Sequence, residues 1–358
     1  MIPAPCGHSW VTRFNGSRPS CGMLKRPLTK YQSPPTVNLL NWTWPGKTIN
    51  QVPRWCAVDL RDGNQSLVNP MTCGFKETEV GFPVASDTNF NFVRKIPKSR
   101  QPNLDNVLLP AREDLIWSTF DAVQDGKNMI IHMYHTTSPL LCQKVFQASK
   151  AKTIDLAVQH TELVRQLSDD SISRGNHTQW QFEYSQKPSL EPKFSVKICE
   201  AVKKAWFHGK DMKKIPPIIF NLPATVEVST PNSPFHQNPI EYFSRSISDR
   251  EYCHISLHTH NDCGTGVAAT ELGSMAGGDC VEGCLFGNGE RTVFTAASGS
   301  HQDAIKKGFA FKIPIHIGKC LTYLSTHTIL AVIMRQLFVS THNQGNEVLP
   351  TSFKNILD

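Results

Sequence analysis

The chain has 358 residues, of which 39% are hydrophobic and 19% are charged, a composition typical of a globular protein. It contains no run of eighteen apolar residues, so the sequence predicts no membrane span. The net charge of +7 comes from the first 58 residues, which carry seven Lys and Arg and no Asp or Glu. The rest of the chain is neutral, which argues against a nucleic-acid surface on the folded body.

The N-terminal residues and the cysteines both indicate in which cellular compartment the protein resides. An acid-free start with Arg and Ser is typical of a mitochondrial transit segment, although prolines at 3, 5, 19 and 27 oppose its amphipathic helix. Residues 1–22 are therefore a candidate leader, and the mitochondrial matrix and the cytoplasm stay open as alternatives. Eleven cysteines without a C-x-x-C pair predict reduced, mostly buried thiols in either compartment.

Residues 23–54 are rich in Pro, Asn and Thr without a sustained period, which predicts an N-terminal arm. From Trp55 onward, short apolar runs of strand length alternate with helical patterns. The candidate strands are 55–59, 77–82, 106–110, 129–134, 180–184, 217–221, 254–258 and 280–286. The candidate helices are 112–125, 151–169, 194–207, 238–249 and 266–276.

Strands that alternate with helices predict a parallel sheet covered by helices, in the α/β class. Eight such units over residues 55–292 predict a (β/α)8 TIM barrel, which typically needs about 250 residues. The alternative is a doubly wound open sheet, but the glycine-rich phosphate turn typical of that fold does not follow the first strand.

The interval between the first two strands is short for a parallel crossover. Such a connection needs about a dozen residues or more and is normally a helix. After the loop at 60–65, residues 66–76 contain Asn69-Pro70 and Cys73-Gly74, which both break helices. The sequence therefore predicts a barrel whose first outer helix is missing.

In a barrel of this kind the reacting groups lie at the carboxyl ends of the strands. His258 and His260 are two apart on one strand, so their imidazoles face the same side. With Asp62 after the first strand they predict a catalytic divalent-metal site that polarises a substrate carbonyl. The other candidates at strand ends are Arg61, His132, Glu183, Thr225 and Glu290. The alternatives are partly buried polar histidines, an Arg61–Asp62 structural ion pair, and a buried Glu183 paired to a base.

Five strings, at 60–65 (LRDGNQ), 74–83, 221–227, 257–266 and 285–292, closely resemble the 2-isopropylmalate synthases, of the long type found in fungi and some bacteria. The resemblance runs from about residue 23 to residue 292 and returns at 298–309. It implies a TIM-barrel acyltransferase that condenses acetyl-CoA with 3-methyl-2-oxobutanoate in leucine biosynthesis. It also implies a homodimer, although that family dimerises partly through C-terminal parts to which the resemblance does not extend.

Residue by residue, the resemblance implies that Asp62, His258 and His260 hold a divalent metal, with Mg²⁺, Zn²⁺ and Mn²⁺ as the choices. It implies contacts to the oxo acid from a second set of side chains, which are Arg61, Gln65, His132, Glu183 and Thr225. It implies acid/base work for Glu290 and His301, and polarisation of the keto group by Arg61.

The chain departs from that family at several positions. His135 replaces an Asn, Val293-Phe294 replace Gly-Asn, and Ile315 replaces a Tyr. We expect residues 293–358 to be a remnant of a linker subdomain followed by an unrelated tail, without the leucine-sensing domain and without inhibition by leucine. We therefore hypothesise a truncated or misassembled enzyme with low or absent activity. The alternatives are a homocitrate or citramalate synthase, or a non-catalytic remnant that binds a metal.

Overall fold

The computed structural model describes residues 39, 41–63, 75–99, 104–137, 142, 148–187, 191–227, 230–231 and 234–284. All of them belong to one compact unit that begins at Thr36. The predicted leader at 1–22 and the predicted remnant at 293–358 lie outside the described residues.

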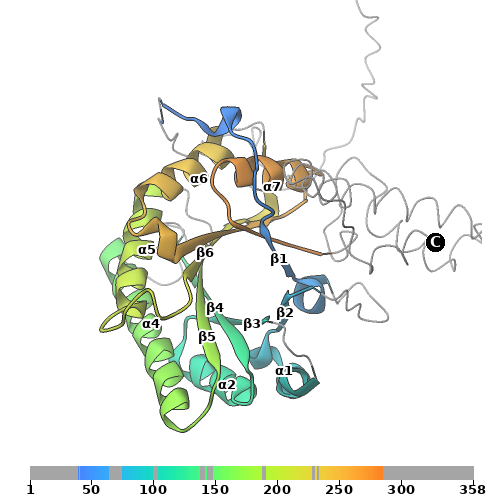
Figure 1. The fold of residues 1–358 in the computed structure, drawn as a ribbon, viewed down its shortest axis with the longest axis vertical. Helices are drawn as coiled ribbons and strands as arrows, with labels where there is room; N and C mark the ends of the chain where they lie inside the picture. Colours follow the sequence, from blue (N-terminus) through green and yellow to red (C-terminus); the bar gives the residue numbers. More distant parts are fainter. Residues whose placement is uncertain are drawn as a thin grey trace, which may run out of the picture. The chain divides into compact units, whose positions relative to one another are not determined.

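Eight parallel strands close into a barrel in which each strand pairs with the next along the chain and β1 pairs with β8 (Figure 1). The strands are β1 (Arg54–Ala57), β2 (Glu77–Gly81), β3 (Leu104–Pro110), β4 (Asn128–Thr136), β5 (Gln179–Lys187), β6 (Ile218–Ala224), β7 (Cys253–Thr259) and β8 (Cys280–Gly283). All eight predicted strands are confirmed. The closed barrel excludes the doubly wound alternative.

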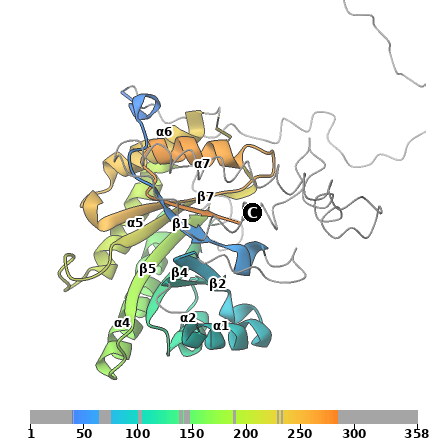
Figure 2. The same ribbon diagram turned by 45° about the vertical axis from the view of Figure 1, so that its right-hand side comes forward.

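Helices cover the outside of the ring (Figures 1 and 2). They are α1 (Asp87–Ser99), α2 (Glu113–Val123), α4 (Lys150–Ser173), α5 (Pro192–Trp206), α6 (Pro234–Ser246) and α7 (Gly266–Met275). The five predicted helices are confirmed, and α1 was not predicted. Within the described ranges, no helix has the combination of length and apolar character that a bilayer crossing requires.

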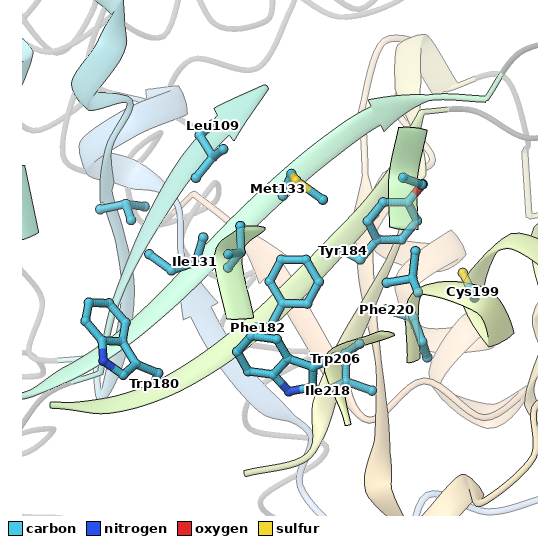
Figure 3. Packing of buried hydrophobic residues seen from close by; sticks show 14 of the residues in the cluster. Leu109, Ile131, Met133, Trp180, Phe182, Tyr184, Cys199, Trp206, Ile218 and Phe220 are labelled. Carbon is cyan, nitrogen blue, oxygen red and sulfur yellow. The ribbon is translucent and has the colours of Figure 1, made fainter. Parts of the chain in front are cut away.

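The apolar core lies between the strands and the helices, because alternate strand residues point outward. On β5, Phe182 and Tyr184 are fully buried on this outer face (Figure 3). The ring of Phe182 stacks on Trp206 of α5 with the ring centroids 4.9 Å apart. The intervening residues of the same strands, such as Glu183, point into the barrel. Because side chains alternate along each strand, the apolar ones pack under the helices and the polar ones face the inside of the barrel.

The connection from β1 to β2 begins with a single π-helical turn, Asp59–Gly63. Residues 64–74 lie outside the described part of the chain, and the described part of this connection contains no α-helix. The missing first outer helix therefore stays a prediction.

Part of the predicted N-terminal arm docks on α6. Glu241, which is fully buried, accepts hydrogen bonds from the Thr43 backbone N–H at 3.0 Å and from the Thr43 hydroxyl at 2.6 Å. The indole Nε1 of Trp44 donates to Asn238 Oδ1 at 3.1 Å. These contacts fix the chain just before it enters the barrel at Arg54.

Candidate active site at the carboxyl end of the barrel

Arg61 and Asp62 lie on the turn that follows β1. The turn is closed by hydrogen bonds from the backbone N–H groups of both residues to the Val58 carbonyl, at 3.1 and 2.8 Å. The Arg61 guanidinium lies 3.2 Å from the Asp62 carboxylate, so the predicted structural ion pair exists. Its closer partner is Glu79, whose Oε2 accepts from Nε at 2.8 Å and lies 2.6 Å from Nη2. Although burial opposes it, the charges of Glu79 and Asp62 raise the pKa of Arg61, which keeps the guanidinium charged.

Glu79 is a site residue that the sequence reasoning missed. It is fully buried on β2, and its Oε1 lies 3.3 Å from His132 Nδ1. Burial alone would raise the pKa of Glu79, but the neighbouring Arg61 and His132 lower it. The available signal was the spacing of Glu77 and Glu79, two apart in a buried strand and therefore on one face.

His132 on β4 and Glu183 on β5 are register partners inside the barrel. Nδ1 of His132 lies 3.8 Å from Glu183 Oε2, which also accepts from Asn106 Nδ2 at 2.7 Å. Asn221 Nδ2 donates to Glu183 Oε1 at 2.8 Å. Burial and the neighbouring Glu282 raise the pKa of Glu183 well above its usual range. Two amides and the His132 imidazole therefore surround the Glu183 carboxyl, so the predicted alternative of a buried Glu183 beside a base stays open.

His258 on β7 contacts Asp62, which follows β1, and Glu282, which lies on β8. Its Nε2 lies 3.6 Å from Asp62 Oδ2, and its Nδ1 lies 2.7 Å from Glu282 Oε2. Glu282, which the sequence reasoning also missed, accepts from Ser256 Oγ at 2.6 Å and from Asn221 Nδ2. Burial opposes protonation of His258, but its bonds to Asp62 and Glu282 raise its pKa to about 10. The His258 hydrogen bond in turn lowers the pKa of Asp62.

These contacts form a closed circuit around the inside of the barrel. It runs from Arg61 through other side chains, each in contact with the next, back to Arg61: Glu79, His132, Glu183, Asn221, Glu282, His258 and Asp62. Seven of the eight strands or their loops contribute to it. The carboxyl end of the barrel therefore brings together residues from the whole length of the described chain.

The predicted metal ligands lie on the same side of the barrel. Asp62 approaches His258, and the rings of His258 and His260 have centroids 5.3 Å apart. His260 Nδ1 lies 3.7 Å from Asp262 Oδ2, and no three His, Cys, Asp or Glu side chains of the described residues enclose a metal position. One carboxylate and two imidazoles are nevertheless donors that suit a divalent cation. A carboxylate on the second nitrogen, as Glu282 provides for His258, is the usual support of such a ligand.

Thr225 and His260 are brought together by strand register. Ala224 of β6 pairs with Thr259 of β7, so the residues that follow each of them leave the barrel side by side. Thr225 begins a single 3₁₀ turn that ends at Glu227, whose carboxylate contacts the loop after β7. The predicted oxo-acid contact and the predicted metal ligand therefore lie on adjacent loops.

Other predicted residues are not part of the described site. Gln65, Glu290 and His301 lie outside the described residues, as do Val293, Phe294 and Ile315. His135 points to the helix-covered outside of β4, where its Nδ1 lies 3.5 Å from the Tyr184 hydroxyl. Burial lowers the pKa of His135 to about 4. This departure from the family therefore does not alter the inside of the barrel.

Comparison with known proteins gives a consistent set of relatives. The 2-isopropylmalate synthase of Schizosaccharomyces pombe is 42% identical over 357 positions, which cover 80% of this chain and 60% of the relative. That of Pseudomonas fluorescens is also 42% identical, with 80% and 62% covered. The 2-isopropylmalate synthase 2, mitochondrial, of Saccharomyces cerevisiae is 41% identical, with 81% and 58% covered.

The chain spans about 60% of the length of these curated relatives. The 357 aligned positions exceed the part of this chain that they cover, so the relatives carry internal segments without a counterpart here. The HMGL-like family matches residues 52–298, which include every described strand of the barrel. The chain belongs to the HMGL-like family and, within the part that aligns, it is similar to 2-isopropylmalate synthases.

Proposed function

We propose that this chain carries the site of an acyltransferase that condenses acetyl-CoA with 3-methyl-2-oxobutanoate to 2-isopropylmalate. The observation that carries the proposal is the closed circuit of side chains at the carboxyl end of the barrel. It connects a guanidinium, two imidazoles, an aspartate and the buried carboxyl of Glu183 in one set of contacting side chains. A guanidinium and imidazoles suit a 2-oxo acid, because it presents a carboxylate and a keto oxygen on adjacent carbons.

Arg61 and His132 are the groups proposed to bind the oxo acid. Arg61 is charged and its side chain is largely buried, and in such surroundings a guanidinium stabilises a carboxylate or a developing alkoxide strongly. His132 is buried, and its Nε2 has no hydrogen-bond partner among the described residues. Buried polar atoms are normally hydrogen-bonded, so this nitrogen is available to bind a polar atom of the substrate. Glu183, Gln65 and Thr225 complete the proposed oxo-acid set.

Asp62, His258 and His260 are the residues that would hold a divalent metal, whether Mg²⁺, Zn²⁺ or Mn²⁺. When bound, such a cation supplies positive charge that polarises the keto group. The protein's own contribution is orientation, because Glu282 holds Nδ1 of His258 and leaves Nε2 directed toward Asp62.

Glu290 and His301 are proposed to move protons during the reaction. A base removes a proton from the acetyl methyl group, and the resulting enolate attacks the keto carbon. An acid protonates the alkoxide that forms, and water then hydrolyses the thioester bond, so that CoA leaves as the free thiol. The mitochondrial matrix and the cytoplasm remain the proposed compartments, and a homodimer is the proposed assembly.

The test is an assay of free CoA by chromatography, with acetyl-CoA, a divalent metal and each of three oxo acids. Release that depends on 3-methyl-2-oxobutanoate and is lost in Asp62→Asn supports the proposal. Release with 2-oxoglutarate or pyruvate instead assigns a homocitrate or citramalate synthase. Binding of the metal and the oxo acid without CoA release assigns the non-catalytic remnant and refutes the catalytic proposal.

A further inference from the structure

Glu227 has a backbone conformation that glutamate rarely adopts. Its φ is 50°, in the left-handed region that favours glycine, and its side chain is buried. Among the described residues other than glycine, Asp249 is the other one with a positive φ, and it lies at the amino end of β7. Strain of this kind persists where surrounding contacts impose it, and it is often found at functional sites.

Within the described part of the chain, the hydrogen bonds that Glu227 accepts come from the loop after β7. Its Oε1 accepts from the Thr265 backbone N–H at 3.0 Å and from the Thr265 hydroxyl. Its Oε2 accepts from the Cys263 backbone N–H. One buried carboxylate therefore satisfies two backbone donors of a loop that has no regular structure of its own.

That loop is folded back on itself, so an anchor at 263–265 also fixes its start. Asn261 Oδ1 accepts from the Gly266 N–H at 2.9 Å. Gly266 lies so close to the His260 carbonyl that a Cβ atom would stand 2.7 Å from that oxygen. The position of His260 is thus tied to the residues that Glu227 binds.

We propose that Glu227 is a positioning residue that joins the Thr225 loop to the His260 loop. It lies two positions after Thr225 in the chain, and its carboxylate reaches the loop that follows the neighbouring strand β7. This inference rests on the proposed function in one respect, since it assigns His260 to the cation and Thr225 to the oxo acid.

The first test is hydrogen exchange of the peptide that covers residues 259–267, measured without metal or substrate. Glu227→Gln loses the charge, and Glu227→Asp keeps the charge but shortens the side chain. Asp249→Asn is the matched control, because it makes the same carboxylate-to-amide change at the other left-handed residue. We expect the amides of 263 and 265 to exchange about tenfold faster in both Glu227 variants, since bonds to a charged acceptor are lost. Amides of β4 report that the barrel is intact, and wild-type exchange at 263 and 265 would refute the anchor.

The second test is the affinity for Mn²⁺ alone, measured by electron paramagnetic resonance of the free ion. We expect Glu227→Gln to weaken binding about tenfold or more, as loss of support for a ligand does, and Asp249→Asn to leave it unchanged. Faster exchange with unchanged Mn²⁺ affinity would make Glu227 a structural anchor only and overturn the positioning role. If the wild type binds no Mn²⁺, the metal part of the proposed function and the positioning of His260 are both refuted. The hydrogen-exchange result then still tests whether Glu227 anchors the loop.

Discussion

Glu79 offers the sharpest test of how the barrel interior orients Arg61. Glu79→Gln removes the charge that two guanidinium nitrogens contact, at 2.8 and 2.6 Å, while the side-chain shape is kept. Breaking a buried ion pair from one side typically costs about 3–5 kcal/mol. The substituted amide still accepts one hydrogen bond, so we expect the free energy of unfolding to fall by about 2–3 kcal/mol. Arg61 would then lose the contact that fixes its guanidinium against β2.

Glu77→Gln is the matched control for this substitution. Glu77 lies two residues earlier on the same inward face of β2, and it pairs with Arg54, which begins β1 at the amino end of the barrel. We expect both variants to lose similar stability in urea unfolding. Only Glu79→Gln should weaken the binding of 3-methyl-2-oxobutanoate in calorimetry, by about tenfold, which corresponds to about 1.4 kcal/mol. If the two variants bind the oxo acid equally well, the orientation of Arg61 by Glu79 is not what recognises it.

Three further predictions concern the core, the arm and the metal ligands. Phe182→Ala removes the ring stacked on α5 and should lower the free energy of unfolding by about 3–5 kcal/mol in denaturant titrations. Burial raises the pKa of Glu241, but hydrogen bonds from the arm lower it below the usual 4.5, so its stabilisation is present above pH 4.5 and is lost as the pH falls through the folded-state pKa. Urea unfolding should therefore separate Glu241→Gln from the wild type at pH 7 and bring them together near pH 3; a constant difference would contradict this. Asp62→Asn and His258→Asn should each abolish Mn²⁺ binding in a resonance titration. His254→Asn, on the same face of β7 but at its amino end, should retain Mn²⁺ binding, and loss there would contradict the placement of the site.

Most strands were predictable because they are short runs rich in apolar residues, and in a helix-covered barrel one face of every strand must be apolar. α1 was not predictable in the same way. Its sequence includes Asn89, Asn91 and Pro97, which are poor helix formers. Val93 of α1 is fully buried, and a Cβ at Gly81 of β2 would lie 2.7 Å from it. Packing against the barrel, which no local pattern reports, therefore stabilises this helix.

The sequence indicated candidate residues at strand ends, together with His132 and Glu183 inside strands, but it did not indicate Glu79 and Glu282, which also lie inside strands. Asp62, His258 and His260 stand at strand ends, where the fold places reacting groups. Glu79 and Glu282 occur within apolar runs that read as strands, and only the direction of the side chain decides whether such a glutamate faces helices or the barrel interior. That direction follows from register, since a shift of one residue exchanges the two faces.

The circuit of side chains also shows which candidate site residues depend on the short connection after β1. His132, Glu183 and Asn221 are fixed by paired strands on both sides. Arg61 and Asp62 instead depend on one turn, hydrogen-bonded to Val58, at the start of that connection. They are also the two members that close the circuit, through Glu79 on one side and His258 on the other. A defect in this connection therefore leaves the β4–β6 part of the circuit intact and removes the guanidinium and the aspartate. The hypothesis of impaired activity thus predicts a protein that folds and retains the contacts between His132, Glu183 and Asn221, yet loses the Arg61 charge that is proposed to polarise the keto group.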